Sequence, residues 1–91
     1  MFYFVYVIEN LDNEVYIGYT SDLTKRLHEH NRGSTFSTKH SKSWRVVYFE
    51  GCLNKNDALR REKYFKTSQG RRLLKRRLKE YFYLRRVSTT G

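Results

Sequence analysis

The sequence predicts an α+β domain in which a small three-stranded antiparallel sheet, with strand order 2-1-3, is flanked by three helices. Three observations predict this class. A segment near the N-terminus is apolar on both alternating faces, a second β-rich segment follows it after a turn, and the C-terminal half has apolar residues at helical spacing. The 91 residues allow a single domain, which we place at residues 1–86, with a frayed C-terminal tail at residues 87–91.

Three segments are predicted to be strands. Residues 2–8 (FYFVYVI) have aromatic and aliphatic side chains on both faces, as expected of a strand that is covered on two sides. Residues 10–14 carry turn-forming types, and residues 15–20 (VYIGYT) return to β-forming types, so a hairpin is predicted. After a polar loop at residues 32–43, residues 44–52 (WRVVYFEGC) form the third strand. The first strand is the doubly apolar one, which places it in the centre of the sheet.

The first predicted helix follows the hairpin directly. An N-cap is available at Thr20, Ser21 or Asp22, because a short side-chain oxygen can accept a hydrogen bond from the first helical turn. The helix is expected to run to about Asn31. Gly33 is placed to end it, since glycine adopts the left-handed conformation that commonly follows a helix.

Two further helices are predicted in the C-terminal half. Asn54 or Asn56 caps a helix over residues 57–67, and Ser68 caps a third helix. The third helix carries apolar residues near helical spacing at Leu74, Leu78, Tyr81 and Leu84. A sheet that is apolar on both faces needs helices on both faces, and these segments supply them.

The length of the hairpin loop decides whether Tyr6 and Tyr16 lie on the same face of the sheet. Side chains alternate along a strand, so a shared face requires an odd number of loop residues or a bulge. A two-residue turn at Asp12 and Asn13 would place the two phenols on opposite faces. We therefore expect a connection of three or five residues.

The excess positive charge lies entirely in the second half of the chain. The net charge is +10, from 19 Lys and Arg against 9 Asp and Glu. Residues 1–54 carry six of each sign, whereas residues 55–86 carry thirteen basic and three acidic residues. Unbalanced like charges on helices repel one another, so a merely solvated face explains this less well than contact with phosphates. The charge predicts a nucleic-acid partner without distinguishing DNA from RNA.

Several classes of protein and of site are excluded by composition. The single cysteine, Cys52, cannot form an internal disulfide, which favours a reducing compartment, and we expect the cytoplasm. The apolar N-terminal segment has no basic leader and is shorter than a spanning helix of about 20 residues. His28, His30 and His40 lack the ligand spacing of a zinc site, and no glycine-rich phosphate loop occurs. We expect a monomer without membrane contact.

Two polar residues share the apolar face of the first predicted helix. Leu23, Arg26, Leu27 and His30 lie at positions i, i+3, i+4 and i+7, so Arg26 and His30 project from the side of the helix that faces the sheet. Each has an ordinary structural explanation by itself: an arginine stem can cover apolar surface, and a histidine at a helix end can be exposed or hydrogen-bonded. Their convergence makes both candidate site residues.

A carboxylate lies in the inward stripe of the second predicted helix. Glu62 falls between Ala58, Leu59 and Phe65 at helical spacing. Burying a carboxylate without a partner is costly, so Glu62 must meet a cation. The candidates are a bound metal, an arginine from across the core, and Lys66 one turn on, the last of which is a frequent and weak helix pair.

The hairpin contributes two tyrosines and a glycine to the candidate site. Tyr6 and Tyr16 are good strand formers, so packing explains either one alone. Gly18 weakens a strand, and such a glycine usually marks a bulge or the close approach of another group. The segment from Tyr16 to Gly18 therefore predicts an open patch beside two phenols.

These residues resemble those of the GIY-YIG nuclease family, in its small stand-alone bacterial form. The resemblance rests on Tyr6, the triplet Tyr16–Gly18, Arg26 ten residues after Tyr16, His30 four residues later, and Glu62 on a later helix. It covers about residues 3–80, and five spaced positions are far more specific than any one of them.

Two departures from the family pattern are visible. Phe4 and Val5 replace the glycine and isoleucine of the first triplet, so only Tyr6 matches there. Tyr19 stands where relatives in excision repair carry a lysine, and the incision role of that repair subunit is therefore not transferred to this chain.

The resemblance implies hydrolysis of phosphodiester bonds in DNA with one Mg²⁺ or Mn²⁺ ion. Tyr6 would lie on the path that takes the proton from the attacking water, and its pKa, about 10 for a free phenol, would have to be lowered by Arg26 and a metal. Tyr16 and His30 would position or relay that proton. Arg26 would stabilise charge on the phosphate oxygens, and Glu62 would hold the metal.

Two other functions compete with an endonuclease of low sequence selectivity. A noncatalytic nucleic-acid-binding module on the same scaffold explains the charge but has no need of an inward Glu62. A small basic protein within a ribonucleoprotein explains the charge but not the tyrosines of the hairpin.

Overall fold

The computed structural model describes residues 1–41 and 43–90, with residues 86–90 described by their backbone alone. The sheet consists of β1 (Tyr3–Glu9), β2 (Val15–Thr20) and β3 (Arg45–Cys52). The strands are antiparallel and follow the order β2-β1-β3, which confirms the predicted topology. β2 is therefore an edge strand, and β1 is the covered centre.

The hairpin between β1 and β2 has the predicted odd loop. Glu9 pairs with Val15, so five residues connect the strands. The Asn10 side-chain oxygen accepts hydrogen bonds from two backbone amides within this loop, at 3.0 and 2.9 Å. The resulting register places Tyr6 and Tyr16 on the same face of the sheet, as the parity argument requires.

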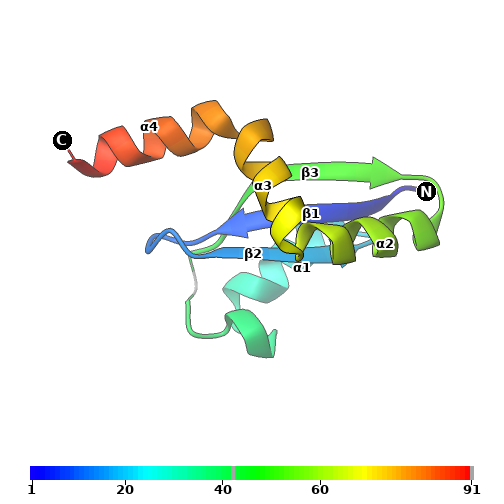
Figure 1. Ribbon diagram of the computed structural model, residues 1–91. Coiled ribbons are helices and arrows are strands. Elements are labelled where there is room, and N and C mark those ends of the chain that lie inside the picture. Colours follow the sequence, from blue (N-terminus) through cyan, green and yellow to red (C-terminus); the bar gives the residue numbers. More distant parts are fainter. Residues whose placement is uncertain (42, 91) are drawn as a thin grey trace.

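Four α-helices flank the sheet, where three were predicted. They are α1 (Leu23–Asn31), α2 (Lys55–Phe65), α3 (Ser68–Arg77) and α4 (Lys79–Thr90). Figure 1 shows α1 on the other side of the sheet from α2 and α3, with α4 extending beyond the end of the sheet. The expected third helix is divided at Leu78, whose backbone at φ −107° and ψ 28° leaves the helical region.

The caps of the helices follow the predicted chemistry with one exception. Asp22 caps α1 and Asn54 caps α2, each by accepting a hydrogen bond from a backbone amide of the first turn. Gly33 lies just beyond α1 with φ +76°. Thr67 caps α3 in place of Ser68, because the Thr67 hydroxyl reaches the amide of Gly70 at 3.1 Å. The frayed tail stays a prediction: α4 is helical to Thr90, and Gly91 lies outside the described residues.

Each face of the sheet carries its own buried cluster. On the α2 and α3 side, Val5 and Val7 of β1 pack with apolar residues of the helices and of β2. On the α1 side, Tyr6 and Ile8 pack with Trp44, and with the leucines of α1 at its margin. The doubly apolar pattern of β1 is thereby explained. It buries opposite faces against different helices.

A buried carboxylate anchors α4 to the end of β1. The Glu9 side chain is fully buried, and the Tyr81 hydroxyl donates a hydrogen bond to it. Arg85 pairs with its other oxygen, and Arg45 donates to the Tyr81 hydroxyl at 2.8 Å. A buried charge needs such partners. These contacts explain why the predicted third helix is divided at Leu78: the change of direction there brings Tyr81 and Arg85 of α4 to Glu9.

Among the described residues, no helix has the length and apolar character needed to cross a membrane.

Candidate active site

The site is built around the hydroxyl of Tyr6, which lies against the backbone of β2. Tyr6 is only 1% exposed and stands opposite Gly18 in the sheet. A Cβ atom placed at Gly18 would lie 2.3 Å from the Tyr6 hydroxyl oxygen and 2.4 Å from its Cζ atom. Only a residue without a side chain leaves this space. Gly18 therefore allows the phenol to cross the edge strand.

His30, on the last turn of α1, holds the Tyr6 hydroxyl from one side. His30 Nε2 lies 2.7 Å from the Tyr6 oxygen, and Nδ1 lies 2.6 Å from the hydroxyl of Thr38. Burial, together with the nearby charge of Arg26, lowers the pKa of His30 to about 4. The imidazole is neutral at pH 7 and can accept a proton on one nitrogen while donating from the other.

Arg26, one helical turn before His30 on the same face of α1, reaches the same hydroxyl. Its Nε donates to the Tyr6 oxygen at 3.4 Å, and its Nη1 donates to Glu29 at 3.0 Å. A hollow of about 470 Å³ opens beside Arg26, between the start of α1 and the end of β2. The guanidinium thus connects the buried phenol with a space that a substrate can enter.

The pKa of Tyr6 is raised, whereas a lowered pKa was expected for this residue. Burial raises the pKa of Tyr6 to about 12, although the hydrogen bond and charge of Arg26 act in the opposite direction. Tyr16 and Glu62 raise the pKa further by their charges. The expected lowering by Arg26 is thus present but outweighed by desolvation. At neutral pH the group is a phenol.

Tyr16 completes a cluster of three rings. Its ring centroid lies 5.1 Å from that of His30 and 6.5 Å from that of Tyr6. Both tyrosines and His30 therefore meet on the α1 face of the sheet, beside Gly18.

Glu62 lies on α2. Of the three cations predicted as its partner, the structure shows Lys66, one turn along the same helix. Lys66 Nζ lies 3.0 Å from Glu62 Oε2, and the same ammonium lies 5.9 Å from the centroid of the Tyr16 ring. The Glu62 side chain is 19% exposed and is close enough for its charge to act on Tyr6. An exposed helix pair of this spacing contributes only about 0.3–0.5 kcal/mol, so a stronger cation can displace Lys66.

The donor set fits a weakly held hard cation. In the described part of the chain, no three His, Cys, Asp or Glu side chains gather in a way that could hold an ion. Mg²⁺ keeps several waters and is commonly held by one or two carboxylates together with substrate phosphates. The partly exposed carboxylate of Glu62, whose partner Lys66 lies over the Tyr16 ring, suits that mode.

Two residues of the site's support escaped the sequence analysis. Thr38 is fully buried in a short 3-10 helix (Phe36–Thr38) within the predicted polar loop, where it meets His30. The Trp44 indole nitrogen donates to the Thr38 carbonyl at 3.0 Å, which fixes this turn. A hydroxyl in a polar segment gives no signal of burial. The one signal in the sequence is Trp44, a large apolar residue directly after the polar loop, which indicates that this part of the loop packs against the core.

Comparisons with known proteins identify the family of this chain. The family model described as the GIY-YIG catalytic domain matches residues 2–75. The chain belongs to the GIY-YIG family. This confirms the resemblance and indicates a nuclease-type function on nucleic acid, in a family whose nucleases generally use divalent metal ions.

The relatives are small bacterial GIY-YIG proteins. A UPF0213 protein of Pediococcus pentosaceus is 41% identical over 66 residues, which cover 71% of this chain and 68% of the relative. The UPF0213 protein YazA of Bacillus subtilis is 38% identical over 65 residues, covering 70% and 66%. The solution NMR structure of the UPF0213 protein BH0048 from Bacillus halodurans superposes with a TM-score of 0.51 at 28% identity, covering 81% and 82% of the two chains.

The buried neutral state of His30 predicts a pH-dependent stability. The unfolded chain protonates this histidine near pH 6.5, whereas the folded chain does so only near pH 4. Keeping His30 neutral therefore costs nothing above pH 6.5. As the pH falls from 6.5 toward 4, the free energy of unfolding decreases by up to about 3 kcal/mol, because the unfolded chain binds the proton more tightly. In urea unfolding between pH 7 and pH 4, the free energy of unfolding of His30→Gln should decrease less with falling pH than that of the wild type. His28→Gln, on the exposed side of α1, should keep the wild-type slope.

Proposed function

We propose that the chain is a metal-dependent endonuclease that hydrolyses phosphodiester bonds in DNA with low sequence selectivity. The observation that carries this proposal is the shared hydrogen bonding of one hydroxyl. Tyr6 lies between a neutral His30 and the cationic Arg26, over a glycine that gives it room. If Tyr6 served only to pack the sheet, its hydroxyl would need neither the charge of Arg26 nor the imidazole of His30 beside it.

The proton path runs from water through Tyr6 to His30. The oxygen of a water forms a bond to phosphorus while the bond to the leaving ester oxygen breaks. The water gives a proton to the Tyr6 oxygen as Tyr6 passes its own proton to His30 Nε2, and the leaving oxygen takes a proton from solvent. This relay avoids a free phenolate, which a pKa of about 12 makes scarce at neutral pH.

Arg26 and Tyr16 act on the substrate rather than on the relay. The planar fork of Arg26 stays charged and can face two phosphate oxygens as negative charge develops on them. The Tyr16 ring lies 6.5 Å, centroid to centroid, from the Tyr6 ring, and its hydroxyl would position the attacking water. Glu62 would hold Mg²⁺ or Mn²⁺, which when bound supplies further stabilisation of that negative charge.

The basic helices provide the surface along which DNA lies. Helix α3 carries five Lys and Arg and no acidic residue, and all five side chains are exposed. Contacts of this kind attract the phosphate backbone without reading sequence, which is why we propose low selectivity. We place the protein in the cytoplasm as a monomer.

A noncatalytic nucleic-acid-binding module is the second candidate, and one observation favours it. Glu62 is paired with Lys66, so a cation already neutralises the carboxylate without any metal. Under this alternative the basic helices bind DNA and the tyrosines serve only to pack the sheet.

Cleavage of plasmid and branched DNA with Mg²⁺ separates the two candidates. The wild type should nick DNA, and Glu62→Gln should need at least about tenfold more Mg²⁺ for the same rate, since one carboxylate ligand is lost. Asp57→Asn removes the same charge from an exposed position on the same helix and should leave the requirement unchanged. DNA binding without any cleavage by the wild type would establish the second candidate.

A further inference from the structure

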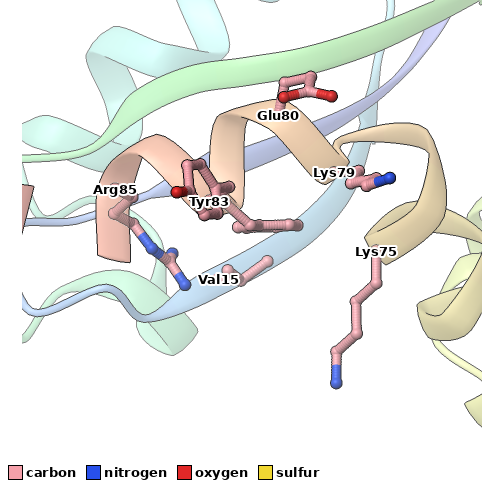
Figure 2. Close-up of a pocket in the computed structure, with 7 residues that line it drawn as sticks. Val15, Lys75, Lys79, Glu80, Tyr83 and Arg85 are labelled. Atoms are coloured by element: carbon pink, nitrogen blue, oxygen red, sulfur yellow. The ribbon is translucent and has the colours of Figure 1, made fainter. Parts of the chain in front are cut away.

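A groove that lies apart from the candidate active site runs between β2 and the helices α3 and α4, and buried core residues line part of it. It consists of two adjoining hollows, of about 710 and 190 Å³, which share Val15, Lys75 and Phe82. The smaller hollow is mostly apolar, with Ile17, Leu74 and Leu78 in its walls. The larger hollow opens to solvent at α4 (Figure 2).

The mouth of the groove combines aromatic and cationic side chains. Tyr83 lines it and is 61% exposed, so its ring is accessible to a ligand. Figure 2 shows Lys75, Lys79 and Arg85 around Val15, with Glu80 on the other side of α4 from the strand. Arg85 is held by Glu9, so Lys75 and Lys79 are the cations that a ligand can use.

Arg71 extends this cationic edge along α3. It lines the inner hollow one helical turn before Lys75, and both side chains are exposed. Neither forms an ion pair with a carboxylate within the described part of the chain. An apolar slot with a free cationic edge is complementary to a ligand that joins a flat apolar ring to a phosphate.

β2 forms a wall of both the groove and the candidate active site. Val15 and Ile17 face the groove, whereas Tyr16 and Gly18 face Tyr6 and His30, because side chains alternate along a strand. Gly18 follows Val15 by three positions, which is about 10 Å along the strand. A nucleic-acid strand that follows this edge would reach the groove within a few nucleotides of the bond presented to Tyr6.

We propose that the groove binds the base of an unpaired nucleotide in the substrate strand. The base would lie against Tyr83 and Phe82, and Arg71, Lys75 and Lys79 would contact the flanking phosphates. This inference rests on the proposed endonuclease function and names its substrate class. That class is DNA with a single-stranded segment beside the cut, such as a flap, a gap or a branch, because a base stacked within a duplex cannot enter the slot.

An acidic peptide is the competing occupant, and the position of the groove argues against it. A peptide would satisfy the cations and the apolar slot, but it would gain nothing from the shared wall with a site built for a phosphodiester. The shared strand and the unpaired cations favour nucleic acid.

The experiment measures binding without cleavage, by fluorescence anisotropy in EDTA. The probes are a labelled 12-nucleotide oligothymidylate and a fully abasic strand of the same length and charge. The wild type should bind the oligothymidylate at least about fivefold more tightly than the abasic strand, because stacking on an aromatic ring is lost with the base. Tyr83→Ala should bind both strands equally, whereas Phe36→Ala, another exposed aromatic residue, should keep the difference.

A second pair of variants tests the cationic edge. Arg71→Gln should weaken binding of the oligothymidylate by more than Arg72→Gln, since both arginines are exposed on α3 but only Arg71 lines the groove. Equal binding of the two strands by the wild type, or a peptide of glutamates that binds through Tyr83 while the oligothymidylate does not, would overturn the proposal. Base-dependent binding by a wild type that never cuts DNA would support the groove and refute the proposed endonuclease.

Discussion

Arg26→Lys should lower the rate constant for cleavage by about 10²–10³-fold while leaving DNA affinity close to that of the wild type. Lysine keeps the charge but replaces a planar fork of donors by a single ammonium group, which cannot hold Tyr6 and face phosphate oxygens at once. The fold should persist, because lysine keeps the charge and the i,i+3 pair with Glu29, partly open to solvent, contributes no more than about 1 kcal/mol. Single-turnover cleavage at saturating protein measures the effect.

Arg32→Lys provides the matched control for this prediction. Arg32 is exposed at the end of the same helix, and the same substitution there should leave the cleavage rate within about twofold of the wild type. An Arg26→Lys variant that cleaves as fast as Arg32→Lys would show that the guanidinium has no part in the reaction.

Gly18→Ala should cost at least about 100-fold in the cleavage rate through displacement of Tyr6. The added Cβ atom would lie 2.3 Å from the Tyr6 oxygen, so the phenol has to move away from His30 and Arg26. A misplacement of about 1 Å in a reacting group can have an effect of this size. Because Tyr6 is buried, the overpacking should also lower the free energy of unfolding by about 1–3 kcal/mol.

Gly51→Ala is the control within the same sheet. A Cβ atom at Gly51 would lie 3.3 Å from the ring of Phe2, which is 51% exposed and can move. This variant should retain both stability and cleavage. If Gly18→Ala behaves like Gly51→Ala, the close approach of Tyr6 to β2 has no catalytic importance.

The sheet could be predicted from the sequence because its determinants are local. The doubly apolar pattern of β1 identifies the central strand, and the parity of the hairpin follows from the alternation of side chains. The convergence of Arg26 and His30 on one face of α1 follows from helical spacing in the same way.

The remainder depends on contacts between residues that are distant in the chain. The division of the third helix at Leu78 has no local signal, since it serves the pairing of Arg85 with Glu9, at opposite ends of the sequence. The burial of Thr38 likewise arises from Trp44 and His30 together. The rise in the pKa of Tyr6 comes from desolvation, which only the packed structure reveals.

The partner of Glu62 shows the limit of spacing alone. Helical periodicity places the carboxylate toward the site, and it equally places Lys66 one turn away. Spacing therefore leaves a metal, an arginine from across the core and the lysine as alternatives, and in the structure the lysine is the partner.

The most direct test of the account is the cleavage rate of Tyr6→Phe, measured under single turnover on branched DNA with Mg²⁺. The substitution keeps the ring and removes only the hydroxyl shared by His30 and Arg26. We predict that this variant binds DNA like the wild type but cleaves at least about 100-fold more slowly, whereas Tyr3→Phe, on the other face of β1, cleaves normally. Cleavage by Tyr6→Phe at the wild-type rate would contradict the assignment of this hydroxyl as the centre of the site.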